Sequence, residues 1–359
     1  MIRAAIVGAT GIVGQQFIVA LKDHPWIEVK ALAASERSAG RSYKDAITAP
    51  GTGALRWFCS EPPVEPVMDM PVVNAADLKT GEVDLVFSAI ESDAAKALEP
   101  HFAADVPVIS TASAFRYEED VPILIPGVNS DHARLLDVQR KKRNWKGFVT
   151  PIPNCTTCGL AITLKPLYET FGLSSVLMTS LQAMSGAGRS PGVIGLDILD
   201  NVIPFIPGEE EKVQRETQKL LGRMEGDSIQ GASFGVSCTC TRVEVLEGHT
   251  ETVFASTGRP ADPEAAIAAM TDYTGGQDVS GLPSAPARMI VVNRDPFRPQ
   301  PRLDRDNDGG MATTVGRVRS DSVLENGLKY VLVSHNTKMG AAKGAVLVAE
   351  MLMRDGYIG

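Results

Sequence analysis

The sequence predicts an α/β protein whose first half forms a parallel sheet and whose second half forms an α+β unit. Short apolar runs in the first half are separated by helical or loop segments, as parallel strands joined by crossovers require. These runs cover residues 2–7, 28–33, 84–89 and 106–110. After residue 155, alternating runs rich in β-branched residues predict antiparallel strands instead. They cover residues 233–245 and 250–256.

The segments between these runs complete the expected order of elements. Residues 41–71 are rich in Gly and Pro and are expected to be irregular, and residues 122–128 are expected to be extended. Further strands are expected at residues 175–182 and 329–334. Helices are expected at residues 15–22, 131–143, 155–170, 209–221, 263–273 and 336–354.

Composition limits the function classes. With 359 residues, 44% hydrophobic and 22% charged, the chain has room for two domains with substantial cores. A net charge of −8 without a basic stripe argues against a nucleic-acid partner. No apolar window reaches membrane-spanning length, and residues 2–7 read as a strand rather than a signal peptide, so no membrane partner is expected. Five cysteines without regular spacing predict no disulfide framework and a cytoplasmic location.

A glycine-rich turn follows the first strand. Gly8, Gly11 and Gly14 stand between a strand and a helix, where glycines allow a tight turn and a close approach of backbone to pyrophosphate. The spacing departs from G-x-G-x-x-G, but its place in a βαβ unit favours a Rossmann-like dinucleotide site. The alternative is a glycine turn without a ligand.

The end of the second strand indicates which dinucleotide binds. NAD-binding versions carry an acidic residue near this position for the ribose 2′-hydroxyl. Here Ser35, Arg37 and Ser38 surround Glu36, and a guanidinium beside two hydroxyls suits a 2′-phosphate. We therefore expect NADP rather than NAD, provided that Glu36 points into solvent.

Cys155 is the candidate nucleophile. Two prolines precede it, and the residues after it can begin a helix, which would place the thiol at a helix N-terminus. The positive end of the helix dipole and the unpaired N–H groups there favour the thiolate, so a lowered pKa is expected. The same N–H groups could receive an oxyanion. The alternative is a small buried hydrophobic residue.

Three other cysteines suggest a zinc or redox site that we discount. Cys158 forms a C-x-x-C pair with Cys155, and Cys238 and Cys240 follow later. A zinc-bound Cys155 could not act as a nucleophile, and C-x-C departs from the usual ligand spacing. We expect no metal and a packed Cys158, with a Cys155–Cys158 disulfide as an oxidative switch being the alternative.

Six motifs in sequence order resemble one enzyme family. They are Gly8-Ala-Thr-Gly-Ile-Val-Gly14, Pro153-Asn-Cys-Thr-Thr157, Gln182-Ala-Met-Ser-Gly-Ala-Gly188, Gly208-Glu-Glu-Glu-Lys212, Arg242-Val-Glu-Val-Leu-Glu-Gly-His249-Thr-Glu251 and His335-Asn336. Nearly the whole chain resembles aspartate-β-semialdehyde dehydrogenase, in particular its archaeal and fungal branch. The resemblance implies NADPH-dependent reductive dephosphorylation of β-aspartyl phosphate to the semialdehyde, an early step towards lysine, threonine, methionine and isoleucine.

The resemblance also implies site residues. The catalytic residues would be Cys155 as nucleophile, His249 as proton shuttle and Gln182 as the group that orients the acyl carbon. The substrate would be held by Arg242 at its α-carboxylate, Glu209 at its amino group, and Lys212 and Arg116 at its phosphate. The cofactor would contact Gly8, Thr10, Gly11, Ile12, Val13, Ser35, Arg37, Ser38, Ser185, Gly186, Gly188 and Asn336. Structural alternatives are a packed histidine at 249, a polar strand end at 182 and a solvated helix start at 209–212.

The resemblance implies an architecture and an assembly as well. An N-terminal NADP-binding domain would cover residues 1–153 and be completed by a C-terminal helix within 336–359. A catalytic and dimerisation domain would cover 154–335, in a homodimer or homotetramer. The rival readings are malonyl-CoA reductase, whose substrate offers no amino group to Glu209, and a non-catalytic NADP-binding sensor.

Overall fold

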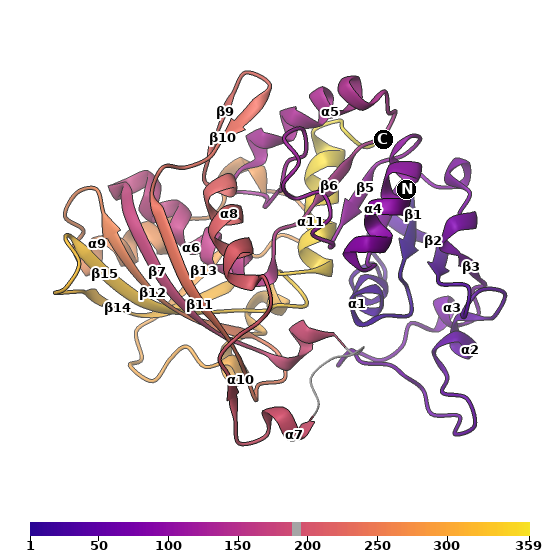
Figure 1. The fold of residues 1–359 in the computed structure, drawn as a ribbon, viewed down its shortest axis with the longest axis horizontal. Coiled ribbons are helices and arrows are strands. Elements are labelled where there is room, and N and C mark those ends of the chain that lie inside the picture. The colour runs from indigo at the N-terminus through magenta and orange to yellow at the C-terminus, as the bar shows by residue number, and fades with distance from the viewer. Residues whose placement is uncertain (189–194) are drawn as a thin grey trace.

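The first half of the chain forms a parallel sheet. The computed structural model describes residues 1–188 and 195–359, and Figure 1 shows its two halves side by side. The first sheet has six strands in the order β3-β2-β1-β4-β5-β6, and every neighbouring pair is parallel. Its strands are β1 (Ile2–Val7), β2 (Ile27–Ala34), β3 (Val72–Asn74), β4 (Leu85–Ser88), β5 (Val108–Ser110) and β6 (Val149–Pro151). Strand order reverses between β1 and β4, and ligands bind at such a switch point in doubly wound sheets.

Helices cover both faces of this sheet. They are α1 (Ile12–Ala20), α4 (Ser92–Ala103), α5 (Leu135–Arg143) and α11 (Ala342–Arg354). Ile6 of β1 packs in a core with Phe17 of α1, whereas its neighbour Val7 packs in a second core with Phe102 of α4. Because both faces are buried, the strands read as continuous apolar runs, which made them predictable. The α/β fold class is confirmed.

The second sheet is mixed. It has seven strands in the order β13-β14-β15-β12-β7-β11-β8. They are β7 (Leu173–Gln182), β8 (Val202–Ile203), β11 (Gly235–Val243), β12 (His249–Thr257), β13 (Ile290–Asn293), β14 (Thr313–Ser320) and β15 (Gly327–Ser334). The antiparallel prediction is confirmed for β12, which runs antiparallel to β7 and β15. It is wrong for the main pairing of β11, which lies parallel to β7 because the chain crosses over through helix α8 before it forms β11.

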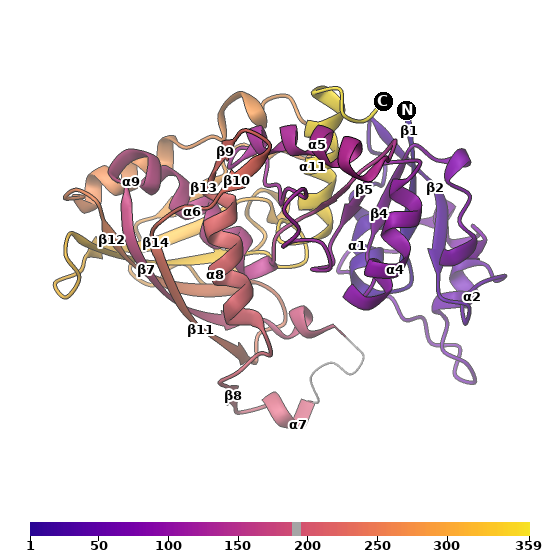
Figure 2. The ribbon, with the colours of Figure 1, turned by 45° about the horizontal axis from the view of Figure 1, so that its top comes forward.

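One face of the second sheet carries helices, and the other leaves apolar side chains exposed. The helices are α6 (Cys155–Phe171), α8 (Glu209–Leu220) and α9 (Pro263–Asp272), and α8 lies along β11 (Figure 2). On the opposite face of β7, Leu177 and Leu181 keep 44% and 36% of their surface exposed, and β12 adds the half-buried Phe254. An apolar, solvent-facing sheet surface of this kind suits a contact with another chain.

The C-terminal helix begins later than predicted. The chain forms turns at residues 336–341, and α11 starts at Ala342. A Cβ on Gly340 would lie 3.0 Å from Cβ of Cys155, so the turn passes close behind the candidate nucleophile. The helix then packs on α1 of the first half, where His24 pairs with the fully buried Glu350 at 2.8 Å.

Short elements complete the fold. The other α-helices of the described residues are α2 (Tyr43–Ile47), α3 (Glu65–Met68), α7 (Gly195–Ile198) and α10 (Pro301–Asp304), and β9 (Arg223–Glu225) pairs with β10 (Ser228–Gln230). Residues 41–71 are largely irregular apart from α2 and α3, and 122–125 have no regular structure. Across residues 1–188 and 195–359, no helix has the length and apolar character needed to cross a bilayer.

Candidate active site

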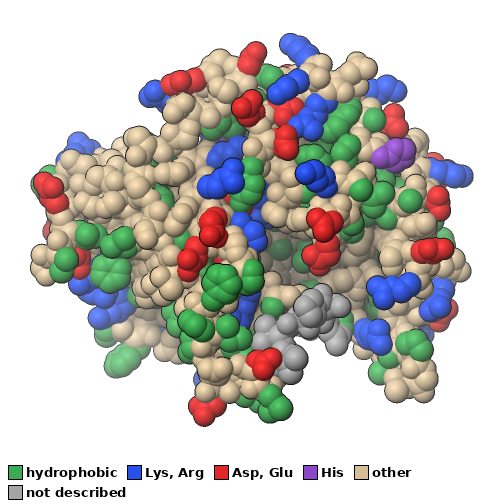
Figure 3. Space-filling model, in the orientation of Figure 1, with side chains coloured by type: hydrophobic (Ala, Val, Ile, Leu, Met, Phe, Trp, Pro, Cys, Tyr) green, Lys and Arg blue, Asp and Glu red, His purple; other side chains and the backbone are tan. Residues whose placement is uncertain are grey.

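A cleft of about 1350 Å³ lies between the two halves (Figure 3). All the predicted site residues line it except Gly8 and His249, and His249 contacts the lining residue Cys155. We call the turn at residues 8–14 and the loop at 35–38 the glycine-turn wall. We call the facing group Cys155, Gln182, Arg242 and His249 the catalytic wall. The structure therefore brings side chains more than 200 residues apart in sequence into one site.

Cys155 occupies the first turn of α6. Asn154 caps this helix, and its side-chain oxygen accepts hydrogen bonds from the N–H groups of Thr156 at 2.9 Å and Thr157 at 3.2 Å. Two of the N–H groups that were expected to receive an oxyanion are therefore already engaged. Asn154 also donates from Nδ2 to Oε1 of Glu209 at 2.8 Å, which ties the start of α6 to the start of α8.

Cys155 and His249 form a pair. Sγ of Cys155 lies 3.2 Å from Nε2 of His249, and Nδ1 of His249 accepts the Ala183 N–H at 3.0 Å. Since Nδ1 must be unprotonated to accept, the hydrogen-bond network assigns the ring proton to Nε2, facing the sulfur. In this tautomer the imidazole donates its Nε2–H to the sulfur.

The expected lowering of the Cys155 pKa is wrong. Although Cys155 keeps some exposed surface, burial and then the negative charge of Glu209 raise the pKa of its thiol to about 12, against the opposing effect of Arg242. Burial, followed by the charge of Arg242, lowers the pKa of His249 to about 3. The resting pair is therefore a neutral thiol beside a neutral imidazole.

Three neighbouring strands end together at the catalytic wall. Gln182 ends β7, Arg242 lies directly opposite it on β11, and His249 begins β12 on the other side. Arg242 is 6% exposed and donates from Nη1 to the Ala183 carbonyl at 2.7 Å, while Gln182 is 1% exposed and donates to Ser180 at 3.2 Å. Pairing register therefore places these side chains together.

Helix α8 brings charged side chains to the same space. Glu209 is buried and forms an ion pair with Lys212 at 3.6 Å. Arg116, from a loop of the first half, is also buried, and its guanidinium donates to Glu216 at 3.0 Å and to the Thr111 carbonyl at 3.0 Å. The cleft thus holds two buried arginines and a lysine beside a carboxylate, a pattern that suits a small zwitterion with additional negative charge.

The glycine-turn wall fits a dinucleotide. Gly8 has φ +85°, and a Cβ there would lie 2.3 Å from the Ala89 carbonyl oxygen. A Cβ on Gly14 would lie 2.3 Å from the Gly8 carbonyl oxygen, whereas one on Gly11 would meet only that oxygen at 3.5 Å. Gly8 and Gly14 are therefore required by packing, while Gly11 keeps the wall open to a pyrophosphate.

The loop after β2 fits a 2′-phosphate. Ser35, Arg37 and Ser38 line the cleft, whereas Glu36 is exposed and is absent from its lining. Arg41 also lines the cleft, and sequence reasoning missed it because it lies within the irregular region. This wall presents cations and hydroxyls rather than an acceptor for a ribose hydroxyl.

Asn336 links the two sides of the catalytic wall. Its Nδ2 donates to Oγ of Ser185 at 2.7 Å, and its Oδ1 accepts the Gly248 N–H at 2.8 Å. A Cβ on Gly186 would lie 3.0 Å from Nη1 of Arg242, so the loop at 184–188 closes tightly on the site. These contacts fix the backbone beside His249.

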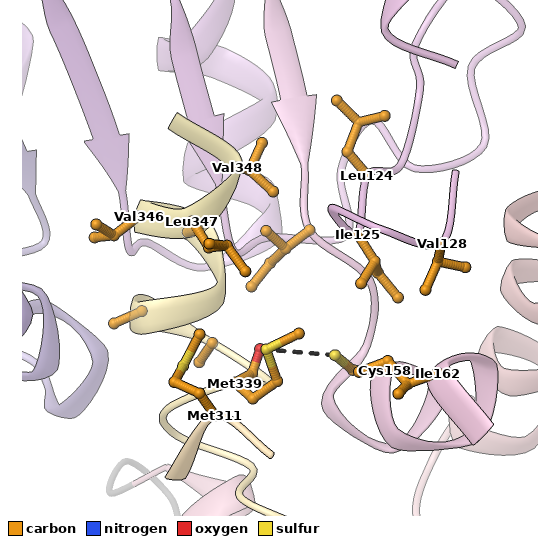
Figure 4. Close-up of a cluster of buried hydrophobic side chains, with 14 of the residues drawn as sticks. Leu124, Ile125, Val128, Cys158, Ile162, Met311, Met339, Val346, Leu347 and Val348 are labelled. Atoms are coloured by element: carbon orange, nitrogen blue, oxygen red, sulfur yellow. Dashed lines mark hydrogen bonds between the residues drawn. The ribbon is translucent and has the colours of Figure 1, made fainter. Parts of the chain in front are cut away.

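The additional cysteines lie in cores. Figure 4 shows Cys158 among apolar side chains, and its Sγ donates a hydrogen bond to the Met339 carbonyl at 3.6 Å. Cys158 is 2% exposed, and burial raises the pKa of its thiol. Cys238 and Cys240 are also buried, and Cys238 donates to the Glu210 carbonyl at 3.3 Å. Packing therefore accounts for these three side chains.

A dinucleotide-type sheet that faces a mixed sheet across a cleft with a Cys–His pair is the arrangement expected of a dehydrogenase that acts through a cysteine. The family model for the NAD-binding domain of semialdehyde dehydrogenases matches residues 3–136, and the model for their dimerisation domain matches 164–339. The aspartate-semialdehyde dehydrogenase of Methanothermobacter thermautotrophicus is 46% identical over 98% of this chain and 99% of its own. That of Candida albicans is 42% identical over 99% of both chains. The chain therefore belongs to the aspartate-semialdehyde dehydrogenase family.

Solved structures of aspartate-semialdehyde dehydrogenases share the fold of this chain. The crystal structure of the Candida albicans enzyme with NADP matches with a TM-score of 0.89 at 39% identity, over 100% of both chains. A Vibrio cholerae aspartate-semialdehyde dehydrogenase II complexed with ASA matches with a TM-score of 0.77 at 27% identity, over 99% of both chains.

Proposed function

We propose that this chain is an NADPH-dependent aspartate-semialdehyde dehydrogenase that converts L-4-aspartyl phosphate into L-aspartate 4-semialdehyde through a thioester on Cys155. The observation that carries the proposal is the 3.2 Å contact between Sγ of Cys155 and Nε2 of His249 in a cleft with buried Arg242 and Glu209. The product is a precursor of lysine, threonine, methionine and isoleucine.

Each charged group of the substrate has a complementary side chain in the cleft. Arg242 is a fork-shaped donor suited to the α-carboxylate, and Glu209 is a buried acceptor suited to the α-ammonium group. Lys212 and Arg116 supply positive charge for the phosphate. Gln182, at the end of β7, orients the acyl group beside the sulfur.

In the first half-reaction Sγ of Cys155 attacks the acyl carbon and the bond to the phosphate oxygen breaks. The thiol proton is transferred to the departing phosphate as the carbon–sulfur bond forms, because the thiolate is the reactive nucleophile. His249 donates its Nε2–H to the oxyanion that forms at the acyl carbon, as a hydrogen-bond donor rather than as the proton shuttle the resemblance implied. The products are a thioester and hydrogen phosphate.

In the second half-reaction the thioester is reduced. Bound NADPH supplies the hydride to the thioester carbon. The Nε2–H of His249 again stabilises the oxyanion, and the carbon–sulfur bond then breaks to release the aldehyde. The thiolate takes one proton from solvent, so the two half-reactions together consume one proton.

We assign the cofactor to the glycine-turn wall. Gly8, Thr10, Gly11, Ile12 and Val13 would hold the pyrophosphate, and Ser35, Arg37 and Ser38 would hold the 2′-phosphate. The loop residues Ser185, Gly186 and Gly188, together with Asn336, would contact the nicotinamide end. The exposed position of Glu36, outside the cleft lining, supports NADP over NAD.

We further propose a cytoplasmic homo-oligomer with a nucleotide domain over residues 1–153, completed by the C-terminal helix, and a catalytic and dimerisation domain over 154–335. The open apolar face around Leu177 and Leu181 supports a dimer through the second sheet. Light scattering of the purified protein distinguishes a homodimer from a homotetramer.

Substrate specificity tests the proposal directly. Oxidation of NADPH and of NADH is followed with aspartyl phosphate, malonyl-CoA and N-acetylglutamyl phosphate, for the wild type and for Cys155→Ser. We expect turnover with aspartyl phosphate and NADPH, and a loss of at least about 10⁴-fold in Cys155→Ser. Turnover with malonyl-CoA alone would contradict the substrate assignment, and the absence of any turnover by a folded wild type would favour a sensor.

A further inference from the structure

Glu216 is a fully buried carboxylate that the chemistry above leaves without a role. It lies on α8, and its surface is 0% exposed. Its Oε1 accepts from Nη1 of Arg116 at 3.0 Å and from the Tyr117 hydroxyl at 3.2 Å. Its Oε2 accepts the backbone N–H of Asn154 at 2.6 Å. One carboxylate therefore joins a cation of the phosphate site to the residue directly before Cys155.

The spacing along α8 explains how Glu216 reaches both. Glu209, Lys212 and Glu216 lie at positions i, i+3 and i+7, which share one face of an α-helix. Glu209 and Lys212 line the cleft, and Glu216 lies about two turns after Glu209 on the same face. A single helix face thus carries the proposed partner of the amino group, the proposed partner of the phosphate and the anchor for the nucleophile loop.

A second residue of α8 grips the same segment of the first half. Nζ of Lys219 donates to the carbonyls of Arg116 at 2.8 Å, Glu118 at 3.1 Å and Val121 at 2.7 Å. The guanidinium of Arg215 lies 3.9 Å from the centroid of the Tyr117 ring. Residues 116–121 are therefore docked on α8 through backbone and side chains, and Glu216 holds the guanidinium of Arg116 within this segment.

We propose that Glu216 is a positioning residue that sets Arg116 and the Cys155 loop at a fixed separation, and thereby selects a phosphate as the leaving group. This inference rests on the proposed function and adds a determinant for the phosphate. If Glu216 is lost, Arg116 loses its partner and can turn away from the phosphate, and the Asn154 N–H loses its acceptor. Binding of the phosphate should then suffer more than binding of the aldehyde or the cofactor.

The test uses the reverse reaction, in which semialdehyde, NADP⁺ and inorganic phosphate are varied separately. In Glu216→Gln we expect the KM for phosphate to rise about 10- to 100-fold, because a hydrogen-bonded charge pair is lost. The KM values for semialdehyde and NADP⁺ should change by less than about twofold. Glu211→Gln is the matched control, since Glu211 carries the same charge on the exposed side of the same helix and should leave all three values unchanged.

A double-variant cycle shows whether Glu216 acts through Arg116. Arg116→Ala alone should raise the KM for phosphate, and adding Glu216→Gln should raise it no further. A rise of all three KM values together in Glu216→Gln, or additive effects on phosphate in the cycle, would overturn the proposal. If Glu216→Gln does not fold, Tyr117→Phe removes one donor to the same carboxylate and should raise the KM for phosphate about two- to fivefold.

Protection of Cys155 separates this inference from the proposed function. Inorganic phosphate should slow the alkylation of Cys155 by iodoacetamide in the wild type and in Glu211→Gln. In Glu216→Gln at least about ten times more phosphate should be needed for equal protection. Equal protection in all three proteins would sink the positioning role, whereas a wild type that is protected yet does not turn over the aspartyl substrate would sink only the proposed function.

Discussion

The two walls of the cleft differ in whether backbone or side chains form the site. In the glycine-turn wall, residues 8–14 present mainly backbone, and a Cβ on Gly8 or Gly14 would lie 2.3 Å from a carbonyl oxygen. The catalytic wall consists of side chains that α6, β7, β11 and β12 bring to one point. Substitutions in the glycine turn should therefore act through steric clashes, and substitutions in the catalytic wall through the loss of a reacting or hydrogen-bonding group.

The largest effect is expected at the catalytic wall. His249→Ala should lower kcat by about 10²- to 10⁴-fold, since one oxyanion donor is removed, while KM for NADPH stays nearly constant. Because burial lowers the pKa of His249 to about 3, the wild type should show no ionisation of this residue in kcat between pH 5 and 8. A titration near pH 6.5 that disappears in His249→Ala would contradict the donor role.

A smaller effect is expected at the glycine-turn wall, where two substitutions should differ. Gly14→Ala places its Cβ 2.3 Å from the Gly8 carbonyl oxygen, so the turn must shift, and we expect a loss of about 1–3 kcal/mol in stability together with weak NADPH binding. Gly11→Ala meets no atom closer than 3.5 Å, and Gly11 has φ −82°, so it should keep its thermal midpoint.

Binding of NADPH separates the two variants further. We expect Gly11→Ala to raise the Kd for NADPH about tenfold, because its methyl group lies where the backbone faces the pyrophosphate. Fluorescence titration with NADPH and thermal unfolding measure both quantities. An unchanged Kd for NADPH in Gly11→Ala would contradict the assignment of the cofactor to this turn.

The last expected effect concerns stability alone and lies behind the catalytic wall, in the strand that carries His249. Glu251 of β12 is fully buried, and within the described residues neither of its carboxylate oxygens has a hydrogen-bond partner. Burial raises the pKa of this carboxyl well above its ordinary value. Between the unfolded pKa, about 4.3, and the folded one, the folded state binds more protons, so wild-type stability falls as pH rises.

Glu251→Gln should remove that penalty. Below about pH 4 the difference in free energy of unfolding between the variant and the wild type should not change with pH. Above it, the variant should gain up to about 1.4 kcal/mol relative to the wild type for each pH unit, until the folded pKa is reached. Urea unfolding of both proteins at pH 5, 6.5 and 8 measures the difference. A gain that does not grow with pH would show that the carboxyl finds a partner.

Short sequence patterns predicted those elements of the fold that depend on neighbouring residues in the chain. The strands of the first sheet, the glycine turn and the helix start at Cys155 follow from short stretches of sequence. The start of α11 was mispredicted because Gly340 and the contacts of Asn336 depend on segments far away in the chain. Parallel pairing of β11 with β7 likewise depends on the crossover through α8, which alternation alone does not report.

Long-range contacts account for what the sequence did not reveal about the site. The N–H that sets the tautomer of His249 belongs to the backbone of Ala183, so the identity of the side chain there does not predict this contact. Glu216 looked like one more charged residue on a polar helix, although its place seven residues after Glu209 was a usable signal. The pKa of Cys155 was expected to fall from helix position alone, whereas burial in the assembled cleft raises it.

The most direct test is to trap the acylated enzyme. The wild type is mixed with aspartyl phosphate without NADPH, quenched in acid and digested, and the peptide that contains Cys155 is examined by mass spectrometry. We expect one aspartyl group on the Cys155 sulfur, none on Cys158, and loss of the adduct when NADPH is added before the quench. An unmodified Cys155 in a protein that turns over the same substrate would contradict the account.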